Sequence, residues 1–401
     1  MSERQFPQLD SLSLSGLAAT FVGNGIGRFA YIALIPVLSQ QAWFSRGEAM
    51  YLGAATLFGY LLGAPLVDEL GRRIAVKTLL RLSFLVCSLS YFVCGWRNGG
   101  FLWFVCWRIL AGFCGAILMV TAPHFVLRSK TQLTGQTGGV VFSGIGFGIV
   151  VSGTLIPILL NWGLTTVWLS LGIICFALTA LTWNSWEPRS VVESQVSKKQ
   201  AQGLRAPGHL TTLLLVAYAL NAIGYLPHTL FWVDFTVTEL HYSFATAGIF
   251  WAVFGVGAVL GPFLTGALAD RYDFPKTLFA AFLLKAIGAA LPLVDTSPVT
   301  LSISSFLVGL FTPGIAGAVS SFAMKMVGET QHKQYWGRLT FSFAATQAAI
   351  GFLMAFAWTA HGSYYLLFVI STTALFVSAI CIASMASYRP GVRLALAGQK
   401  D

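Results

Sequence analysis

Residues 64–73 read APLVDELGRR and residues 266–276 read GALADRYDFPK, and these two matching stretches decide the fold. Asp68 and Asp270 occupy the same place in the two copies, about half a chain apart. Each copy follows one long apolar stretch and opens another, so a charged connection recurs at the same position. This recurrence predicts a chain built from two related halves.

The composition indicates a membrane protein. Of the 401 residues, 56% are hydrophobic and 9% are charged, whereas soluble domains have about 25% charged residues. The first apolar run is too long for the hydrophobic region of a cleavable signal peptide. The formal net charge of +10 is explained by basic connections on one side of a membrane, so nucleic-acid binding is not expected.

Twelve apolar segments are long enough to cross a bilayer as helices. They cover residues 12–38, 47–67, 74–94, 100–122, 137–160, 165–183, 210–234, 243–268, 276–293, 299–322, 336–359 and 363–387. We predict an all-α membrane protein with twelve transmembrane helices in two pseudo-symmetric six-helix halves. The halves are residues 1–183 and residues 209–401 with a short tail, joined by a polar linker at 184–208. One large class of secondary transporters is built from such repeated halves.

Basic residues fall on one side of this predicted topology. The connections on that side contain Arg72, Arg73, Lys77, Arg128, Lys130, Arg271, Lys276, Lys333 and Arg338. The connections on the other side contain only Arg46 and Arg97. Positive residues are retained in the cytoplasm. We therefore expect a multi-pass protein of a bacterial-type inner membrane, with both termini cytoplasmic.

Four segments resemble signatures of the major facilitator superfamily. The two aspartate segments are similar to G-x-L-A-D-R-x-G-R-[RK] between helices 2–3 and 8–9, although Asp273 replaces the second glycine of the later copy. Residues 108–116, RILAGFCGA, resemble the R-x-x-x-G-x-x-x-A pattern of helix 4. Residues 144–153, GIGFGIVVSG, resemble the antiporter motif of helix 5 without its proline.

Within that superfamily the chain resembles the YbfB/YjiJ-type group, whose substrates are mostly unassigned. The resemblance rests on residues 25–31, GIGRFAY, and residues 224–229, GYLPHT. It implies the major facilitator fold and a secondary active transporter that works by alternating access. We expect no enzymatic activity, cofactor or metal, and a monomer surrounded by membrane lipid.

The resemblance also implies gating contacts at the two aspartate segments. In that superfamily the aspartate faces the positive end of a helix, and neighbouring arginines pair across the cytoplasmic face. Such contacts would break as the halves rock. The alternative is that the arginines only keep the connection in the cytoplasm. The residues concerned are Asp68, Gly71, Arg72, Arg73, Asp270 and Arg271.

Arg28 is predicted near the middle of the first helix, beside Asn24. A charge at this depth is costly unless it faces water or a partner, and no Asp or Glu lies deep in any predicted span. A partner that arrives with the substrate favours a carboxylate, phosphate or similar anion. The alternative is a structural arginine bonded to backbone carbonyls or to Tyr and Asn side chains.

The segments Asn24–Arg28 and Asn221–Tyr225 align in the two halves, and they differ by Arg against Tyr. This difference is the best pointer to the substrate site. The candidate substrate-binding residues are Asn24, Arg28, Tyr31, Arg108, Asn221, Tyr225 and His228.

Three residues are candidates for proton coupling. His228 follows Pro227, which interrupts its helix, and imidazole changes charge near neutral pH. A neutral histidine bonded to a neighbouring helix is the alternative. Asp234 lies at the outer end of the same helix, and the resemblance associates Arg108 with a proton-linked or substrate-facing role. Lys285 and Arg81 are expected to be structural, with stems that reach a membrane interface.

The leading functional hypothesis is transport of a small organic, anionic solute across the inner membrane. Export is favoured over uptake because of helix 5, whose glycines are nevertheless interpreted first as packing contacts. Uptake of a carboxylate-type metabolite is the alternative, and proton coupling stays open. An integral-membrane enzyme acting on lipid or acyl groups is the remote alternative, because its best constellation, His124 with Ser129 and Thr131, lacks a carboxylate.

Overall fold

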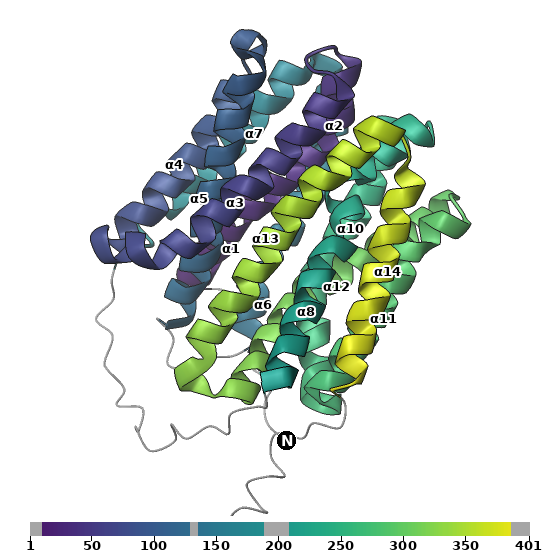
Figure 1. Cartoon of the computed structure of the whole chain (residues 1–401). Coiled ribbons are helices and arrows are strands. Elements are labelled where there is room, and N and C mark those ends of the chain that lie inside the picture. The colour runs from purple at the N-terminus through teal and green to yellow at the C-terminus, as the bar shows by residue number, and fades with distance from the viewer. Residues whose placement is uncertain (1–9, 129–134, 188–207, 386–401) are drawn as a thin grey trace, which may run out of the picture.

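The computed structural model describes residues 10–128, 135–187 and 208–385, and throughout these ranges the regular elements are helical. Twelve helices in them are long and apolar enough to cross a membrane, which confirms the predicted number of spans. Figure 1 shows one bundle of long helices that run up and down beside each other. Most of the predicted linker and the predicted tail beyond residue 385 lie outside the described residues.

The first six spans form the N-terminal half. Its first span is interrupted and consists of α1 (Ser11–Thr20), the π-helical turn η1 (Phe21–Ala30) and α2 (Tyr31–Gln40). The other five are α3 (Arg46–Arg73), α4 (Val76–Cys94), α5 (Gly100–Arg128), α6 (Gly135–Leu159) and α7 (Leu164–Thr182).

The last six spans form the C-terminal half. Its first span is interrupted too, and consists of α8 (Gly208–Gly224), the π-helical turn η5 (Pro227–Phe231), α9 (Trp232–Asp234) and the π-helical turn η6 (Phe235–Glu239). The other five are α10 (Phe244–Tyr272), α11 (Phe274–Val294), α12 (Pro298–Val327), α13 (Glu329–His361) and α14 (Tyr364–Ala383). The repeat is therefore visible in the distorted first span of each half.

The aspartate segments are helical, which corrects the prediction that they are loops. Asp68 lies within α3, which continues to Arg73, and Asp270 lies within α10, which continues to Tyr272. The charged residues do not end the first helix, because Glu69 pairs with Arg73 one turn later at 2.7 Å. Helix α10 ends at Tyr272, and the next residue, Asp273, has a φ of 88°, a conformation that favours glycine.

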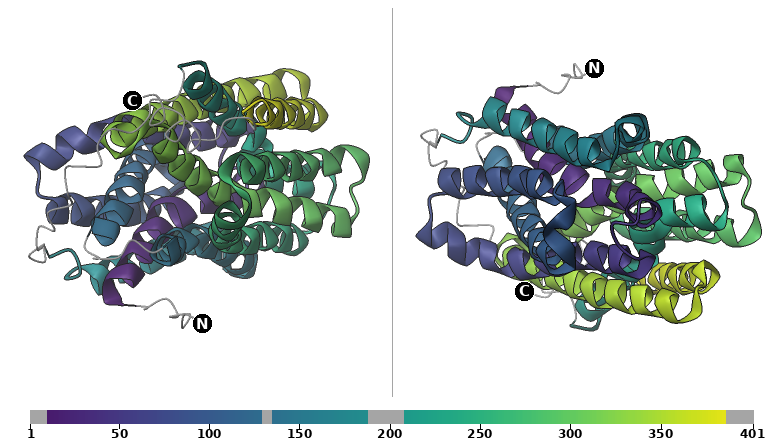
Figure 2. Two further views of the ribbon diagram at one scale, coloured as in Figure 1. Left: turned by 90° about the horizontal axis from the view of Figure 1, so that it is seen from below. Right: turned by 90° about the horizontal axis from the view of Figure 1, so that it is seen from above.

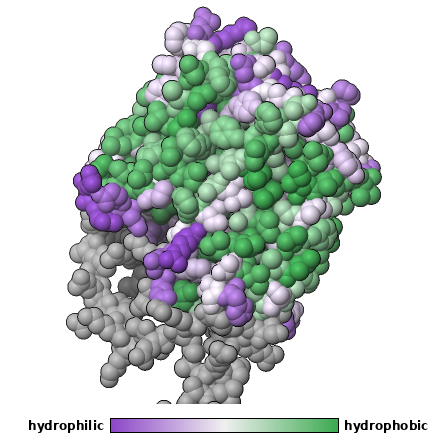
Figure 3. Space-filling view, viewed as in Figure 1, coloured by the Kyte–Doolittle hydropathy of each residue, from purple (hydrophilic) through white to green (hydrophobic). Residues whose placement is uncertain are grey.

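The surface is apolar around the middle of the bundle and polar at both ends (Figure 3). Large apolar side chains near the middle of the spans are exposed, for example Ile173 (59%) and Phe176 (52%) in α7 and Val256 (45%) in α10. A patch of this extent is not tolerated in water, so this apolar belt is the part of the protein that faces lipid. We call the end that carries Arg73 and Tyr272 the basic end, and the other the opposite end.

The two halves lie side by side, as the views along the bundle in Figure 2 show. They meet mainly through α3 against α13 and α6 against α10. The helix 5 glycines do serve packing, which confirms that interpretation. A Cβ added at Gly153 would lie 2.6 Å from the carbonyl oxygen of Gly248 across the interface. One added at Gly148 would lie 2.5 Å from Cα of Gly25 in η1.

In each half, a glycine at the equivalent position allows two helices to cross closely, α3 and α5 in the N-terminal half and α10 and α12 in the C-terminal half. Gly59 and Gly261 each precede the aspartate of their segment by nine residues. A Cβ at Gly59 would lie 2.0 Å from the carbonyl oxygen of Ile109, and a Cβ at Gly261 would lie 1.8 Å from that of Leu310. No side chain fits at either place without moving a helix.

We therefore expect Gly261→Ala to lower the free energy of unfolding by about 1–3 kcal/mol, because the new methyl group overpacks the α10–α12 crossing. The measurement is the thermal unfolding temperature of the detergent-purified protein. Gly317→Ala in α12 is the matched control, since a Cβ there meets no heavy atom within 4 Å. Equal unfolding temperatures for the two variants would contradict the expectation.

Candidate functional site

The middle of the first span contains two of the predicted substrate-binding residues. Residues 23–27 read GNGIG, a composition that stabilises an α-helix poorly. The helix widens here into η1, and π-helical turns are frequent at functional sites. Asn24 (6% exposed) and Arg28 (8% exposed) lie in this turn and are buried in the bundle.

Arg108 of α5 fixes the backbone of η1. Its Nη2 donates to the carbonyl of Gly27 at 2.9 Å, and its Nε donates to Oγ1 of Thr56 at 3.0 Å. The hydroxyl of Tyr91 donates to the carbonyl of Ile26. A buried carbonyl must be paired, so these side chains stabilise the widened turn.

Tyr31 lies against Arg108. The centroid of its ring is 4.5 Å from Cζ of the guanidinium, and its hydroxyl donates to the carbonyl of Ala49 at 2.9 Å. Both side chains are fully buried. These two predicted substrate-binding residues are thus bonded within the N-terminal half, although Nη1 of Arg108 has no hydrogen-bond partner in the described part of the chain.

A hydrogen bond joins the two positions that the repeat singled out. Nη2 of Arg28 donates to the hydroxyl of Tyr225 in the other half at 3.1 Å. Nε2 of Gln347 donates to the same oxygen. Within the described residues, Nε of Arg28 and Oδ1 of Asn24 have no partner. Arg28 and Asn24 therefore offer one unpaired donor and one unpaired acceptor at the centre of the bundle.

On the other side of Tyr225 lies Lys285 of α11. Its Nζ donates to Oδ1 of Asn221 at 2.9 Å and lies 4.7 Å from the centroid of the Tyr225 ring. Lys285 is fully buried, so the expectation that its stem reaches an interface is wrong. It lies halfway along α11, which packs against both α12 and α14. Arg81, as expected of a structural residue, donates to the carbonyl of Trp183 at 2.8 Å.

His228 lies in η5, shortly after Tyr225. Pro227 begins this π-helical turn, so it interrupts the regular helix as predicted. Its Nε2 is 2.8 Å from Oγ of Ser304, whose own proton goes to the carbonyl of Gly288 at 2.6 Å. Nε2 is therefore the protonated nitrogen. Nδ1 is left as an acceptor without a partner among the described residues.

A polar cluster joins the halves at the opposite end. Nε of Arg46, at the start of α3, lies 3.0 Å from Oδ2 of Asp234, and its Nη2 donates to the hydroxyl of Tyr364 at 3.0 Å. That hydroxyl in turn donates to Asp234. The Arg46 guanidinium also covers the ring of Trp358, 4.6 Å from its centroid. We call these four residues the end cluster.

The predicted gating residues lie at the basic end. Glu69 pairs with Arg73 at 2.7 Å and with Arg72 at 3.4 Å along α3, while the side chain of Asp68 is exposed. The guanidinium of Arg271 lies 5.2 Å from the ring of Tyr272. The side chain of Asp270 lies outside the described residues. Gating by Asp68, Gly71, Arg72, Arg73, Asp270 and Arg271 therefore stays a prediction.

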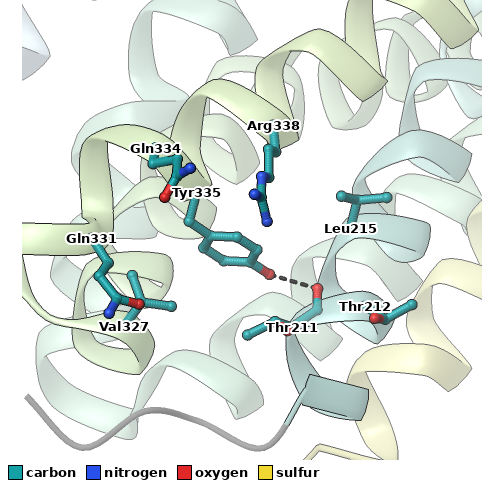
Figure 4. Close-up of a pocket in the computed structure, with 8 residues that line it drawn as sticks. All are labelled: Thr211, Thr212, Leu215, Val327, Gln331, Gln334, Tyr335 and Arg338. Carbon is teal, nitrogen blue, oxygen red and sulfur yellow. Dashed lines mark hydrogen bonds between the residues drawn. The ribbon is translucent and has the colours of Figure 1, made fainter.

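A pocket of about 320 Å³ opens at the basic end of the C-terminal half. Figure 4 shows Tyr335 reaching across it to donate to the carbonyl of Thr211 at 2.6 Å, with the side chain of Arg338 beside the ring. The lining residues are Thr211, Thr212, Leu215, Val327, Gln331, Gln334, Tyr335 and Arg338. None of them was predicted as a site residue.

The sequence thus identified Arg28, Tyr225 and Asn221 but missed the two side chains that complete their surroundings. Lys285 had a detectable signal, because it is a lysine in the middle of a predicted span. Gln347 had only the weaker signal of an amide inside an apolar helix. The remote enzyme candidate cannot be assembled here, since Ser129 and Thr131 lie outside the described residues.

Comparison with solved structures places the bundle among known transporter folds. The crystal structure of a D-xylose-proton symporter superposes with a TM-score of 0.74, covering 93% of this chain and 96% of that one. The two sequences are 13% identical, so this likeness concerns the fold alone.

Three curated relatives are named for drug resistance. The multi-drug resistance efflux pump PmrA homolog of Lactococcus lactis is 22% identical over 79% of this chain and 80% of its own length. The chloramphenicol resistance protein of Streptomyces lividans is 25% identical over 74% and 77%, and the class H tetracycline resistance protein of Pasteurella multocida is 24% identical over 61% of each chain.

A family model described as "Uncharacterised MFS-type transporter YbfB" matches residues 20–383, nearly the whole described bundle. The predicted resemblance is confirmed, and with it the twelve-helix fold of the major facilitator superfamily. The chain belongs to the YbfB family of transporters within that superfamily.

Proposed function

We propose that this transporter exports a small organic anion across a bacterial-type inner membrane, and that Arg28 binds the anionic group. One observation carries the proposal. The buried guanidinium of Arg28 is bonded to a tyrosine hydroxyl, has a free Nε, and takes part in none of the ion pairs of the described residues. Membership of a transporter family excludes the membrane-enzyme alternative.

Electrostatics supports an anionic ligand. An uncompensated arginine at the centre of a membrane helix costs about 2.5–3.5 kcal/mol on insertion scales. Nε and Nη2 form one edge of the guanidinium, and this edge holds a carboxylate or phosphate with two parallel hydrogen bonds. An incoming anion would displace the hydroxyl of Tyr225 from Nη2 and take the free Nε as well. Oδ1 of Asn24 would accept from a hydroxyl or amino group on the same ligand.

The end cluster supports alternating access. In the conformation of this structure, the end cluster closes the opposite end of the bundle. It links Arg46 of the N-terminal half to Asp234 and Tyr364 of the C-terminal half. With the basic end in the cytoplasm, as expected from the distribution of Lys and Arg, the closed end is external. The pocket between α8, α12 and α13 is then on the cytoplasmic side, where an exported solute enters.

The comparisons favour export over uptake. One relative is named a multi-drug resistance efflux pump, and two others are named resistance proteins. Uptake of a carboxylate-type metabolite is the second candidate, because the same fold occurs in a protein named as a sugar-proton symporter. The direction in which a proton gradient drives net flux distinguishes the two.

We assign proton coupling, where it occurs, to Asp234 before His228. Among the described residues, Asp234 is the carboxylate buried within a span, and protonation would remove its ion pair with Arg46. His228 can accept a proton at its free Nδ1, but its ring is already bonded to α12. Arg108 is bonded to the carbonyl of Gly27, so we assign it to positioning η1 and not to proton transfer.

Arg28→Gln should reduce counterflow of anionic solutes by about 10- to 100-fold, because it removes a charge-assisted hydrogen bond worth about 1.5–3 kcal/mol. Arg28→Lys should retain part of the flux, since it keeps the charge but loses the two-donor edge. The measurement is counterflow of radiolabelled benzoate, lactate and succinate in proteoliposomes, with choline and xylose as cationic and neutral solutes.

Arg81→Gln is the control for this test, because Arg81 is bonded to the Trp183 carbonyl and lies outside the centre. It should leave the ratio of anionic to neutral flux unchanged. Flux of cationic solutes alone, unaffected by Arg28→Gln, would refute the anion proposal.

Arg46→Met should open the opposite end. It leaves the carboxylate of Asp234 buried without its partner, which typically costs about 3–5 kcal/mol. Asp234→Asn should open it less, because the charge that it leaves unpaired is that of Arg46, whose side chain is partly exposed. Spin labels at Gln40 and Glu239, both exposed at that end, would report a larger distance between the halves by double electron–electron resonance.

Arg97→Met is the matched control for the end cluster. Arg97 lies at the same end, but its Nη2 donates to the carbonyl of Ala42 in its own half, at 3.1 Å. It should leave the distance distribution unchanged. If Arg46→Met gives the same distribution as Arg97→Met, the end cluster does not hold the halves together.

A further inference from the structure

Lys285 is a second buried cation that the proposed role of Arg28 does not use. It is fully buried halfway along α11, and its one hydrogen bond is to Oδ1 of Asn221 at 2.9 Å. An ammonium group has three donors. None of the ion pairs in the described residues includes Lys285. A neutral amide and an aromatic ring thus contact it, and the imidazole of His228 lies near enough to interact with its charge.

Tyr225 stands between this lysine and Arg28. Its hydroxyl accepts from Nη2 of Arg28, while Nζ of Lys285 lies 4.7 Å from the centroid of its ring. Arg28 belongs to the N-terminal half and Lys285 to the C-terminal half. Two cations without a carboxylate therefore meet at one side chain on the interface between the halves.

Tyr225 is also prepared to bind an anion itself. Its oxygen already accepts from Arg28 and from Gln347, so both of its acceptor sites are used. Its own proton is left to donate. Arg28 and Tyr225 are bonded to each other, Nζ of Lys285 lies over the same tyrosine ring, and no ion pair of the described residues includes either cation.

We infer that Lys285 is the second cation of the substrate site and that the site takes a doubly charged anion, such as a dicarboxylate or a phosphate monoester. The inference rests on the proposed function and names its substrate class. Neutralising two cations requires two negative charges, because a single carboxylate leaves one cation uncompensated in the bundle. Since the cations belong to different halves, such a ligand also draws the halves together.

The arrangement at Arg108 is different, which is why it is not counted as a third cation of the site. Two of its nitrogens donate to the Gly27 carbonyl and to Thr56, and its face covers the ring of Tyr31. Lys285 has no such set of acceptors. Its charge is the one that a ligand would complement.

The test compares binding of doubly and singly charged anions. The probes are succinate and glycerol phosphate against butyrate, and the measurement is the dissociation constant from ligand-dependent thermal stabilisation of the purified full chain. The wild type should bind the dianions more tightly. Lys285→Gln should weaken dianion binding about 10- to 100-fold and change butyrate binding less than threefold, while Lys285→Arg should retain the preference.

Lys325→Gln is the matched control. Lys325 also lies over an aromatic ring, 4.4 Å from the centroid of Phe274, but it is exposed at the basic end of α12. It should leave every dissociation constant unchanged. A Lys285 with a merely structural role would lower stability in the Gln variant without altering the ratio of dianion to monoanion binding.

Each result bears on one proposal. Anion binding that depends on Arg28 but keeps its dianion preference in Lys285→Gln overturns the role of Lys285 and leaves the proposed function intact. If the wild type binds no anion and Arg28→Gln behaves like the wild type, the proposed function is overturned, and the role of Lys285 with it. If Lys285→Gln does not fold, equal affinity of the wild type for succinate and butyrate is enough to overturn the inference.

Discussion

A positive charge inside a membrane bundle must be compensated, and this constraint organises the centre of the molecule. The described spans bury Arg28, Arg108 and Lys285, while the carboxylate of Asp234 is paired with Arg46 near the opposite end. Arg108 is compensated by dipoles, because the widened turn η1 directs the carbonyl of Gly27 to it. Arg28 and Lys285 have only neutral partners, so in the proposed function an anionic ligand would compensate them.

The pseudo-symmetry of the chain places the uncompensated charge of Arg28 at the interface between the halves. Arg28 and Tyr225 occupy equivalent positions in the two halves, and they bond to each other across the boundary. Had both positions been arginine, two like charges would face each other without a ligand. Tyrosine at one position supplies an oxygen for the empty state and can be displaced by a stronger acceptor. The difference between the repeats therefore lets these two positions bond directly to each other across the interface.

Hydropathy was sufficient to predict the number of spans, because each span must by itself satisfy the length of the bilayer, and the internal repeat divided these spans into two halves. The internal repeat was sufficient to find Arg28 and Tyr225. The repeat could not identify Lys285 as a residue of the centre, because the side chain of a lysine in a span can also extend to the membrane interface. The packing of α11 against α12 and α14 is what buries Lys285. The pair Arg46 and Asp234 was also missed. The two residues are 188 positions apart, and each alone resembles an ordinary charge near a helix end.

The contacts at the centre and at the opposite end both cross the same boundary, and they respond differently to an anion. The end cluster contains its own carboxylate and is complete without a ligand. In the proposed function, the cations at the centre are paired only when an anionic ligand is bound. If the halves separate without a ligand, Arg28 loses the hydroxyl of Tyr225 and gains nothing except water. With an anion bound, the same separation must also break bonds between the ligand and one half. In the proposed function, an anion at the centre would therefore change the relative stability of the states in which the halves touch or part there, and such a difference is what alternating access requires.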